Sequence, residues 1–150
     1  MNLKNLLGNV LIVTTLGLSI SCGLTDPEPA PGTILGTGNI EVQNEKNYNF
    51  GSVGESYGYV TFYYEQEWHD TEISSPYGIQ YGSGNTAPAT GYSRDLINVE
   101  ISKSYFYRSD SLENRFIYGR LIITKLEYNS SSIIEFEWII QKEPGNREFY

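Results

Sequence analysis

The segment RFIYGRLIITKLEYNSSSIIEFEWIIQK, residues 115–142, decides the fold. Its two arms, 115–128 and 132–142, are rich in β-branched and aromatic residues and flank the polar triplet Asn-Ser-Ser at 129–131. Such a triplet favours a tight turn between two strands, so the segment predicts a long antiparallel hairpin. Apolar side chains alternate along the second arm and form the predicted core face: Ile134, Phe136, Trp138 and Ile140.

The same strand signature continues upstream, and no segment shows the apolar repeat of an amphipathic helix. Residues 58–66 and 96–103 alternate apolar with polar side chains, as half-buried strands do. Residues 39–43, 77–81 and 104–108 are weaker candidates, the last continuing the 96–103 strand through a bulge. Six or seven strands therefore predict an all-β fold: an antiparallel β-sandwich, with a small β-barrel as the alternative.

The first 22 residues differ in character from the rest of the chain. Lys4 precedes an apolar stretch at 6–20, which stops at Ser21 and Cys22. A positive start, a short apolar run and small residues at its end are the marks of a secretory signal peptide. The run is too short to span a bilayer comfortably, so we expect the fold to start after this segment.

Residues 18–22, Leu-Ser-Ile-Ser-Cys, resemble the lipobox of bacterial lipoproteins, in which a small residue directly precedes a modified cysteine. Leu18 stands one place early and Ser19 takes the usual leucine position, a form similar to the looser lipoboxes of spirochaetes. The resemblance implies cleavage before Cys22 and a diacylglyceryl thioether on its sulfur. Gly23 resembles the residue found in lipoproteins released to the outer membrane. The alternative is an ordinary unpaired Cys22 after a conventional signal peptide.

These features divide the chain into three parts. Residues 1–21 form the predicted lipoprotein signal peptide, and residues 22–38 form the lipidated cysteine and a linker that carries three prolines and four glycines. This composition predicts a tether that holds the domain away from the bilayer. Residues 39–150 form a single all-β domain, whose length supports one hydrophobic core.

Composition limits the classes of function. The formal net charge is −8, and removal of Lys4 would make it more negative. An acidic surface repels nucleic acid phosphates, so no nucleic acid partner is expected. Cys22 is the only cysteine, which leaves the mature domain none for disulfides, zinc thiolates or nucleophilic catalysis. No motif in the sequence implies a cofactor.

The only histidine lies in an acidic stretch, residues 65–72. If the preceding strand continues, Glu65, Glu67 and His69 share one face and could ligate a divalent metal, as in a metal-assisted hydrolase. The alternative is a solvent-facing strand side, on which successive side chains stand about 7 Å apart. No G-x-S-x-G nucleophile motif is present, so the sequence favours a binding protein over an enzyme.

Residues 74–94 combine tyrosines with serine, glycine, asparagine and proline. Tyrosine offers broad amphipathic contact at low rotamer cost, and small residues let a loop conform to a ligand. Tyr77, Tyr81 and Tyr92 are therefore the predicted ligand-binding residues. The alternative is an ordinary surface connection between strands.

Together these features predict a lipoprotein of the bacterial cell envelope, anchored at the outer membrane, that binds a protein or a saccharide without catalysis. Two alternatives stay open. One is a structural or assembly subunit that pairs with a partner through an exposed sheet edge. The other is a metal-assisted hydrolase at His69.

Overall fold

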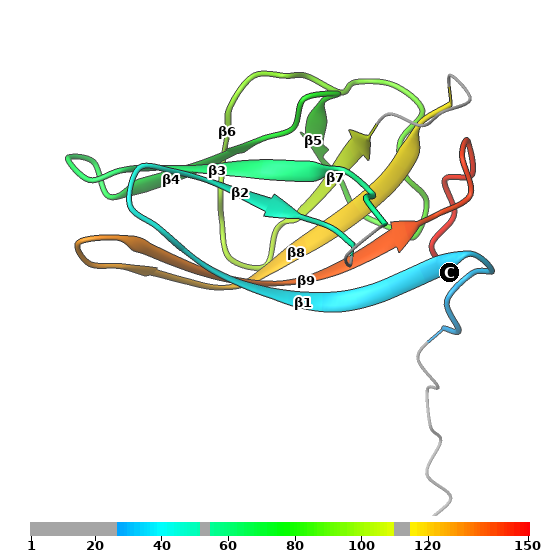
Figure 1. Cartoon of the computed structure of the whole chain (residues 1–150), viewed down its shortest axis with the longest axis horizontal. Helices are drawn as coiled ribbons and strands as arrows, with labels where there is room; N and C mark the ends of the chain where they lie inside the picture. Colours follow the sequence, from blue (N-terminus) through cyan, green and yellow to red (C-terminus); the bar gives the residue numbers. More distant parts are fainter. Residues whose placement is uncertain (1–26, 52–54, 110–114) are drawn as a thin grey trace, which may run out of the picture.

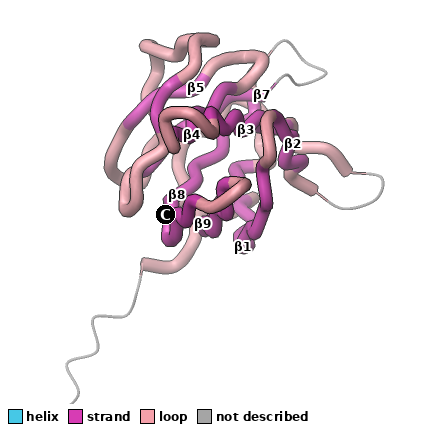
Figure 2. Tube along the Cα trace, turned by 90° about the vertical axis from the view of Figure 1, so that its left-hand side faces the viewer, coloured by secondary structure: helices cyan, strands magenta, loops and turns pink. Residues whose placement is uncertain are grey.

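Two antiparallel β-sheets make up the part of the chain that the computed structural model describes, residues 27–51, 55–109 and 115–150 (Figure 1). The five-stranded sheet has the order β1 (Thr33–Val42), β9 (Ser132–Gln141), β8 (Ile117–Tyr128), β7 (Ser104–Ser109) and β5 (Ile79–Tyr81). The four-stranded sheet has the order β2 (Glu45–Asn49), β3 (Tyr59–Glu65), β4 (Asp70–Ser74) and β6 (Ile97–Asn98). Figure 2 shows the layers from the side, with β1, β8 and β9 below β2, β3 and β4.

The predicted all-β sandwich is confirmed. The strands of the described residues pair antiparallel, and neither sheet closes on itself, which separates the sandwich from the small-barrel alternative. The described part holds nine strands where six or seven were expected. The two strands that the sequence did not predict are β2, which is polar as exposed edge strands often are, and β4, which begins in the acidic stretch 65–72.

The 115–142 hairpin forms as predicted. β8 and β9 pair along their length on either side of the 129–131 turn. The register shifts between Ile123 and Lys125, where β8 carries one extra residue and the ladder bulges. The predicted core side chains face the second sheet, with Ile134, Phe136 and Ile140 buried and Trp138 partly buried.

Aromatic side chains fill the space between the two sheets. Phe136 of β9 contacts Phe62 of β3, with ring centroids 5.5 Å apart, and Tyr48 of β2 meets Phe136 edge-on at 4.8 Å. Phe50 stacks on Tyr107 of β7 at 4.7 Å. Such pairs contribute roughly 0.5–1.5 kcal/mol beyond the burial of their area, so these rings stabilise the contact between the layers.

The domain starts earlier than the predicted 39–150, because β1 begins inside the predicted 22–38 linker. Gly36 pairs with Trp138 of β9, whose ring lies where a Cβ would stand, and Gly38 faces a phenylalanine ring in the same way. These glycines serve close packing of rings across the ladder. Glycine content therefore suggested flexibility where the structure uses it for contact.

The predicted 96–103 strand is only partly formed. Pairing is confined to β6, and the chain turns at Ser102, whose φ is +64°. Ile101 is 55% exposed, although alternation placed it on the same face as the buried Val99. The turn carries the chain from the four-stranded to the five-stranded sheet, so residues 104–108 belong to a separate strand, β7.

A second, smaller core covers part of the outer face of the five-stranded sheet. Phe106, Tyr118 and Ile139 pack there against Ala87 and Phe149. Ala87 lies in a loop and Phe149 in the C-terminal segment, and backbone hydrogen bonds join these two segments. Alternation placed Ile139 on the solvent-facing side of the hairpin, but this second core buries it.

A substitution at Gly119 tests the close packing of the core between the two sheets, which we call the first core. Gly119 lies opposite Tyr107, and an added Cβ would overlap that ring, which is fully buried and stacked on Phe50. Gly119→Ala is expected to lower the free energy of unfolding by about 2–3 kcal/mol, measured by urea denaturation. Gly36→Ala is the matched variant, with about 1 kcal/mol expected because the partly exposed Trp138 ring can shift. Equal midpoints for Gly119→Ala and the wild type would contradict this packing.

Alkaline pH tests the burial of the same tyrosine. Burial raises the pKa of the Tyr107 hydroxyl well above its ordinary value of 10.0. The folded state thus holds this proton more tightly than the unfolded chain, so its contribution to stability is complete below about pH 10 and is lost as the pH rises further. The urea midpoint is expected to fall above about pH 10, and Tyr107→Phe is expected to flatten that fall. A wild-type midpoint that stays constant through this range would show that the ring is accessible.

Candidate functional site

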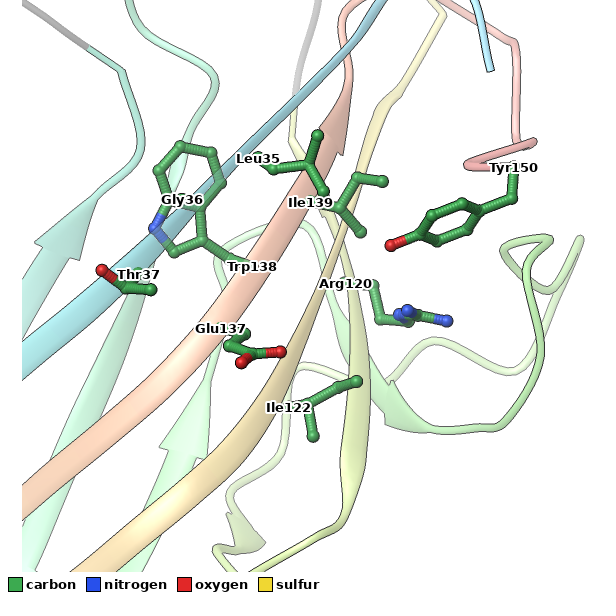
Figure 3. Close-up of a pocket in the computed structure, with 9 residues that line it drawn as sticks. All are labelled: Leu35, Gly36, Thr37, Arg120, Ile122, Glu137, Trp138, Ile139 and Tyr150. Carbon is green, nitrogen blue, oxygen red and sulfur yellow. The ribbon is translucent and has the colours of Figure 1, made fainter. Parts of the chain in front are cut away.

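An open groove lies on the outer face of the five-stranded sheet, beside the second core. Outward side chains of β1, β9 and β8 line it in two adjacent rows, with Leu35, Ile139 and Arg120 in one and Thr37, Glu137 and Ile122 in the other. The three apolar side chains, Leu35, Ile139 and Ile122, form its floor. Tyr150 stands at one end and its hydroxyl points over the floor (Figure 3). The cavity among these side chains is about 280 Å³, and we call it the outer groove.

A wider hollow of about 700 Å³ adjoins the outer groove, and Arg120 and Tyr150 line both. Residues 27–29 and Asn85 contribute to the wall of this wider hollow. Cavities of roughly 300–1,000 Å³ accept small ligands or the anchoring side chains of larger ones. The combined space is therefore large enough for a ligand that extends beyond one side chain.

The floor of the outer groove is apolar and partly open to solvent. Leu35 is 54% exposed, whereas Ile139 beside it is buried in the second core. Trp138, the neighbour of Ile139 in sequence, points to the opposite face of the sheet and packs against the first core (Figure 3). Successive side chains of β9 thus contribute to the first and the second core in turn. The groove is the part of the outer sheet face that the second core leaves open to solvent.

Arg120 supplies positive charge to the outer groove. Its Nη1 donates to the carbonyl of Gly84 at 2.6 Å and lies 3.4 Å from the side-chain oxygen of Asn85. The Tyr150 ring centroid is 5.7 Å from Arg120 Cζ, within the range of a cation–π contact. Its Nε is buried and has no hydrogen-bond partner among the described residues. The guanidinium is therefore held in place while part of its donor capacity stays unused.

Glu137 supplies the negative charge of the same groove. It is exposed on β9, between Thr37 of β1 and Ile122 of β8, one row away from Arg120. The groove thus combines an apolar floor with one group that donates hydrogen bonds and one that accepts them. Such a lining can orient a ligand that has an apolar body and polar groups on both sides.

The three predicted ligand-binding tyrosines do not converge on one site. Tyr92 packs on Tyr118 of the second core at 6.1 Å, whereas Tyr81 packs on Tyr105 of the first core at 5.0 Å. Tyr77 lies on the same side of the sheet as Tyr92. Its ring centroid is 6.4 Å from that of Phe116, which packs on the second core. The loop tyrosines are therefore divided between the two faces of the five-stranded sheet.

Tyr92 fastens the loop of residues 74–94 to β7. Arg108 Cζ lies 4.5 Å from the Tyr92 ring centroid and 4.3 Å from that of Phe116, so the guanidinium is held between two rings. Arg108 Nε also donates to the Tyr77 carbonyl at 3.0 Å. Burial raises the pKa of the Tyr92 hydroxyl well above its ordinary range. This residue accordingly contributes to packing more than to a contact surface.

The predicted metal ligands are not assembled. β3 ends at Glu65 and residues 66–69 form a turn, so Glu65, Glu67 and His69 do not share a strand face. His69 has a left-handed φ of +50°, and its Nδ1 lies 3.1 Å from the Tyr64 hydroxyl. In residues 27–51, 55–109 and 115–150, no group of three or more His, Cys, Asp or Glu side chains is placed to hold a metal ion.

The predicted lipidation residue lies outside the described residues. Cys22 and the whole 1–21 signal peptide precede the first described residue, Pro27. Within the described ranges, no helix has the length and apolar character that crossing a membrane requires.

Comparison with known proteins adds no residue to the site. The chain matches no protein-family model, no curated protein and no solved structure. The candidate site therefore rests on the geometry of this chain.

The sequence did not point to the outer groove. Alternation placed Glu137 on an outward face. Nothing in the sequence connected it with Leu35, which lies far from it along the chain, or with Tyr150, which lies beyond the predicted hairpin. The pairing of β1, β9 and β8 brings them together. Arg120 was the available signal, since it is a charged residue between the apolar stretches 116–118 and 121–123.

Proposed function

We propose that this protein is a lipid-anchored binding protein of the bacterial cell envelope, held at the outer membrane through Cys22, which captures a segment of a partner protein in the outer groove without catalysis. One observation carries the proposal. The outer face of the five-stranded sheet is covered by the second core on one side and open over an apolar floor on the other. Apolar surface that stays open beside well-placed polar groups is typical of interaction sites.

The lining of the outer groove suits a peptide segment. Leu35 and Ile122 offer apolar area to one side chain of the partner. Arg120 can donate to a carbonyl or carboxylate through the terminal N–H groups that Gly84 and Asn85 do not take, and Glu137 can accept from an amide or an ammonium group. A peptide presents these three kinds of group at a regular spacing, so a single segment can satisfy the whole lining.

Strand addition at β1 is less favoured than binding in the groove. β1 is an edge strand, but the Thr37 carbonyl accepts a hydrogen bond from the Tyr48 hydroxyl at 3.2 Å, and the Glu41 carbonyl accepts one from Lys46 Nζ at 3.1 Å. Both donors belong to β2. Side-chain cover of this kind protects sheet edges from pairing with another chain. This observation supports the groove over an assembly subunit that pairs through the edge of β1.

The anchor would keep the outer groove close to the bilayer. Residues 27–29 line the wider hollow beside the groove, and five residue steps separate Cys22 from Pro27. An extended chain covers at most about 3.3–3.6 Å per residue, so this tether spans no more than roughly 18 Å. The partner of the groove is therefore a protein at the membrane surface, and the tether is shorter than the predicted 22–38 linker implied.

Replacement of the anchor residue tests the membrane attachment. Two or more acyl chains hold a protein stably on a bilayer, whereas a chain without them has no such attachment. Cys22→Ala is therefore expected to move the protein from the detergent phase to the soluble fraction, measured by phase partitioning. The mass of the mature wild-type chain is expected to exceed that of the polypeptide by the attached lipid. A wild-type protein that begins at Met1, or that washes off in buffer with an unmodified thiol, would contradict the anchor.

Photo-crosslinking tests capture in the groove. A photoreactive amino acid at Thr37, in cells that produce the protein, is expected to form a protein adduct. Leu35→Ser is expected to reduce the yield of that adduct at least about tenfold, because a buried leucine contributes roughly 1.5–3 kcal/mol. Leu96→Ser is the matched control, since Leu96 is 44% exposed but lies outside the groove. An adduct that survives Leu35→Ser unchanged would overturn the groove as the binding site.

A further inference from the structure

A second hollow, of about 480 Å³, lies at the end of β5 and shares no lining residue with the outer groove. Residues 81–83 form one side of it. Glu100 and residues 102–104, which lead into β7, form the other side. We call this hollow the Tyr81 pocket.

An aromatic platform forms one wall of the Tyr81 pocket. Tyr81 is 42% exposed, and its ring rests on the buried Tyr105 ring, with centroids 5.0 Å apart. The Tyr81 hydroxyl donates to the Asn98 carbonyl, and the Tyr105 hydroxyl donates to the same oxygen at 2.8 Å. The Tyr105 hydroxyl also accepts the backbone N–H of Glu100 at 2.8 Å. The exposed ring and the opposite wall are thus fixed to one network, so the pocket is organised before a ligand arrives.

Polar groups surround this platform. Glu100 and Lys103 lie on the opposite wall, with 3.9 Å between the carboxylate oxygen and Nζ, and both side chains are more than half exposed. Ser102 between them holds the left-handed φ of +64° that is uncommon for a residue with a side chain. Strained backbone of this sort concentrates at functional sites. The turn therefore keeps a donor and an acceptor at the same rim.

Ser104 adds a hydroxyl that the protein does not satisfy. Its Oγ is buried and has no hydrogen-bond partner among the described residues. Ser104 lines the Tyr81 pocket together with Ser83 and Ser102.

We propose that the Tyr81 pocket binds one neutral pyranose unit of a saccharide. The apolar C–H face of the sugar stacks on the Tyr81 ring, whose π-face is negative and attracts it. The sugar hydroxyls, which both donate and accept, bond to Glu100, Lys103 and the exposed serines Ser83 and Ser102. Because the carboxylate and the ammonium group offset each other, the pocket favours an uncharged ligand. This site is separate from the proposed capture of a protein segment and stands if that proposal fails.

Nuclear magnetic resonance of the isolated full-length protein in detergent tests the site, with cellobiose, maltose and N,N′-diacetylchitobiose as probes. At least one probe is expected to give saturable shifts at the amides of residues 82, 83, 102 and 103, with a Kd of the order of 1 mM. Tyr81→Leu is expected to raise that Kd at least about tenfold, and Tyr81→Phe, which keeps the ring, less than about threefold. Tyr77→Leu is the matched control, because Tyr77 belongs to the same loop but not to the pocket.

Two further variants keep the test decisive. Glu100→Gln changes an exposed side chain that the fold does not need, and it is expected to raise the Kd about fivefold even if Tyr81→Leu is unstable. Leu35→Ser is expected to leave the sugar shifts unchanged, which distinguishes this site from the outer groove. The proposal is overturned if none of the three sugars gives saturable shifts, if the shifts map elsewhere, or if Tyr81→Leu or Glu100→Gln binds like the wild type.

Discussion

The register of β9 between β1 and β8 is the constraint on which the rest of the structure depends. Successive side chains of β9 point to opposite faces, so a slip of one residue would exchange Phe136 with Glu137 and bury a carboxylate in the first core. Gly38 reinforces the observed pairing, because the Phe136 ring occupies the space that any larger residue there would need. The shape of the packed side chains, together with the backbone ladder, therefore selects one alignment of the three strands.

This register also builds the surface that we propose as functional. It places Leu35, Ile139 and Arg120 in one row on the outer face of the sheet, where the C-terminal segment and one loop cover only part of the apolar area. A complete third layer would have buried Leu35. The partial cover leaves an apolar floor with Tyr150 at its end and a fixed guanidinium beside it, which is the geometry of a binding groove.

Tyrosine both fills the cores of this protein and lines its surface pocket, because its ring is apolar and its hydroxyl can bond to backbone groups. A buried ring such as Tyr105 fills the core while its hydroxyl bonds to backbone groups, which anchors an adjoining loop. Tyr92 is similarly committed to packing around Arg108. Tyr81 differs because it leaves part of its ring in solvent. It lines the pocket at the end of β5. Composition alone does not separate these uses, since the same side chain suits both.

By itself the sequence determined the all-β class, the 115–142 hairpin and its core face, because alternation and turn residues act between near neighbours and are visible in a short window. The tertiary structure decided the start of β1 at its glycines, the turn at Ser102, the separation of Glu65 from His69, and the outer groove. Each of these depends on contacts between segments far apart in the chain or on where a strand must leave its sheet. Such contacts follow from how side chains of distant strands fit together, which no local pattern encodes.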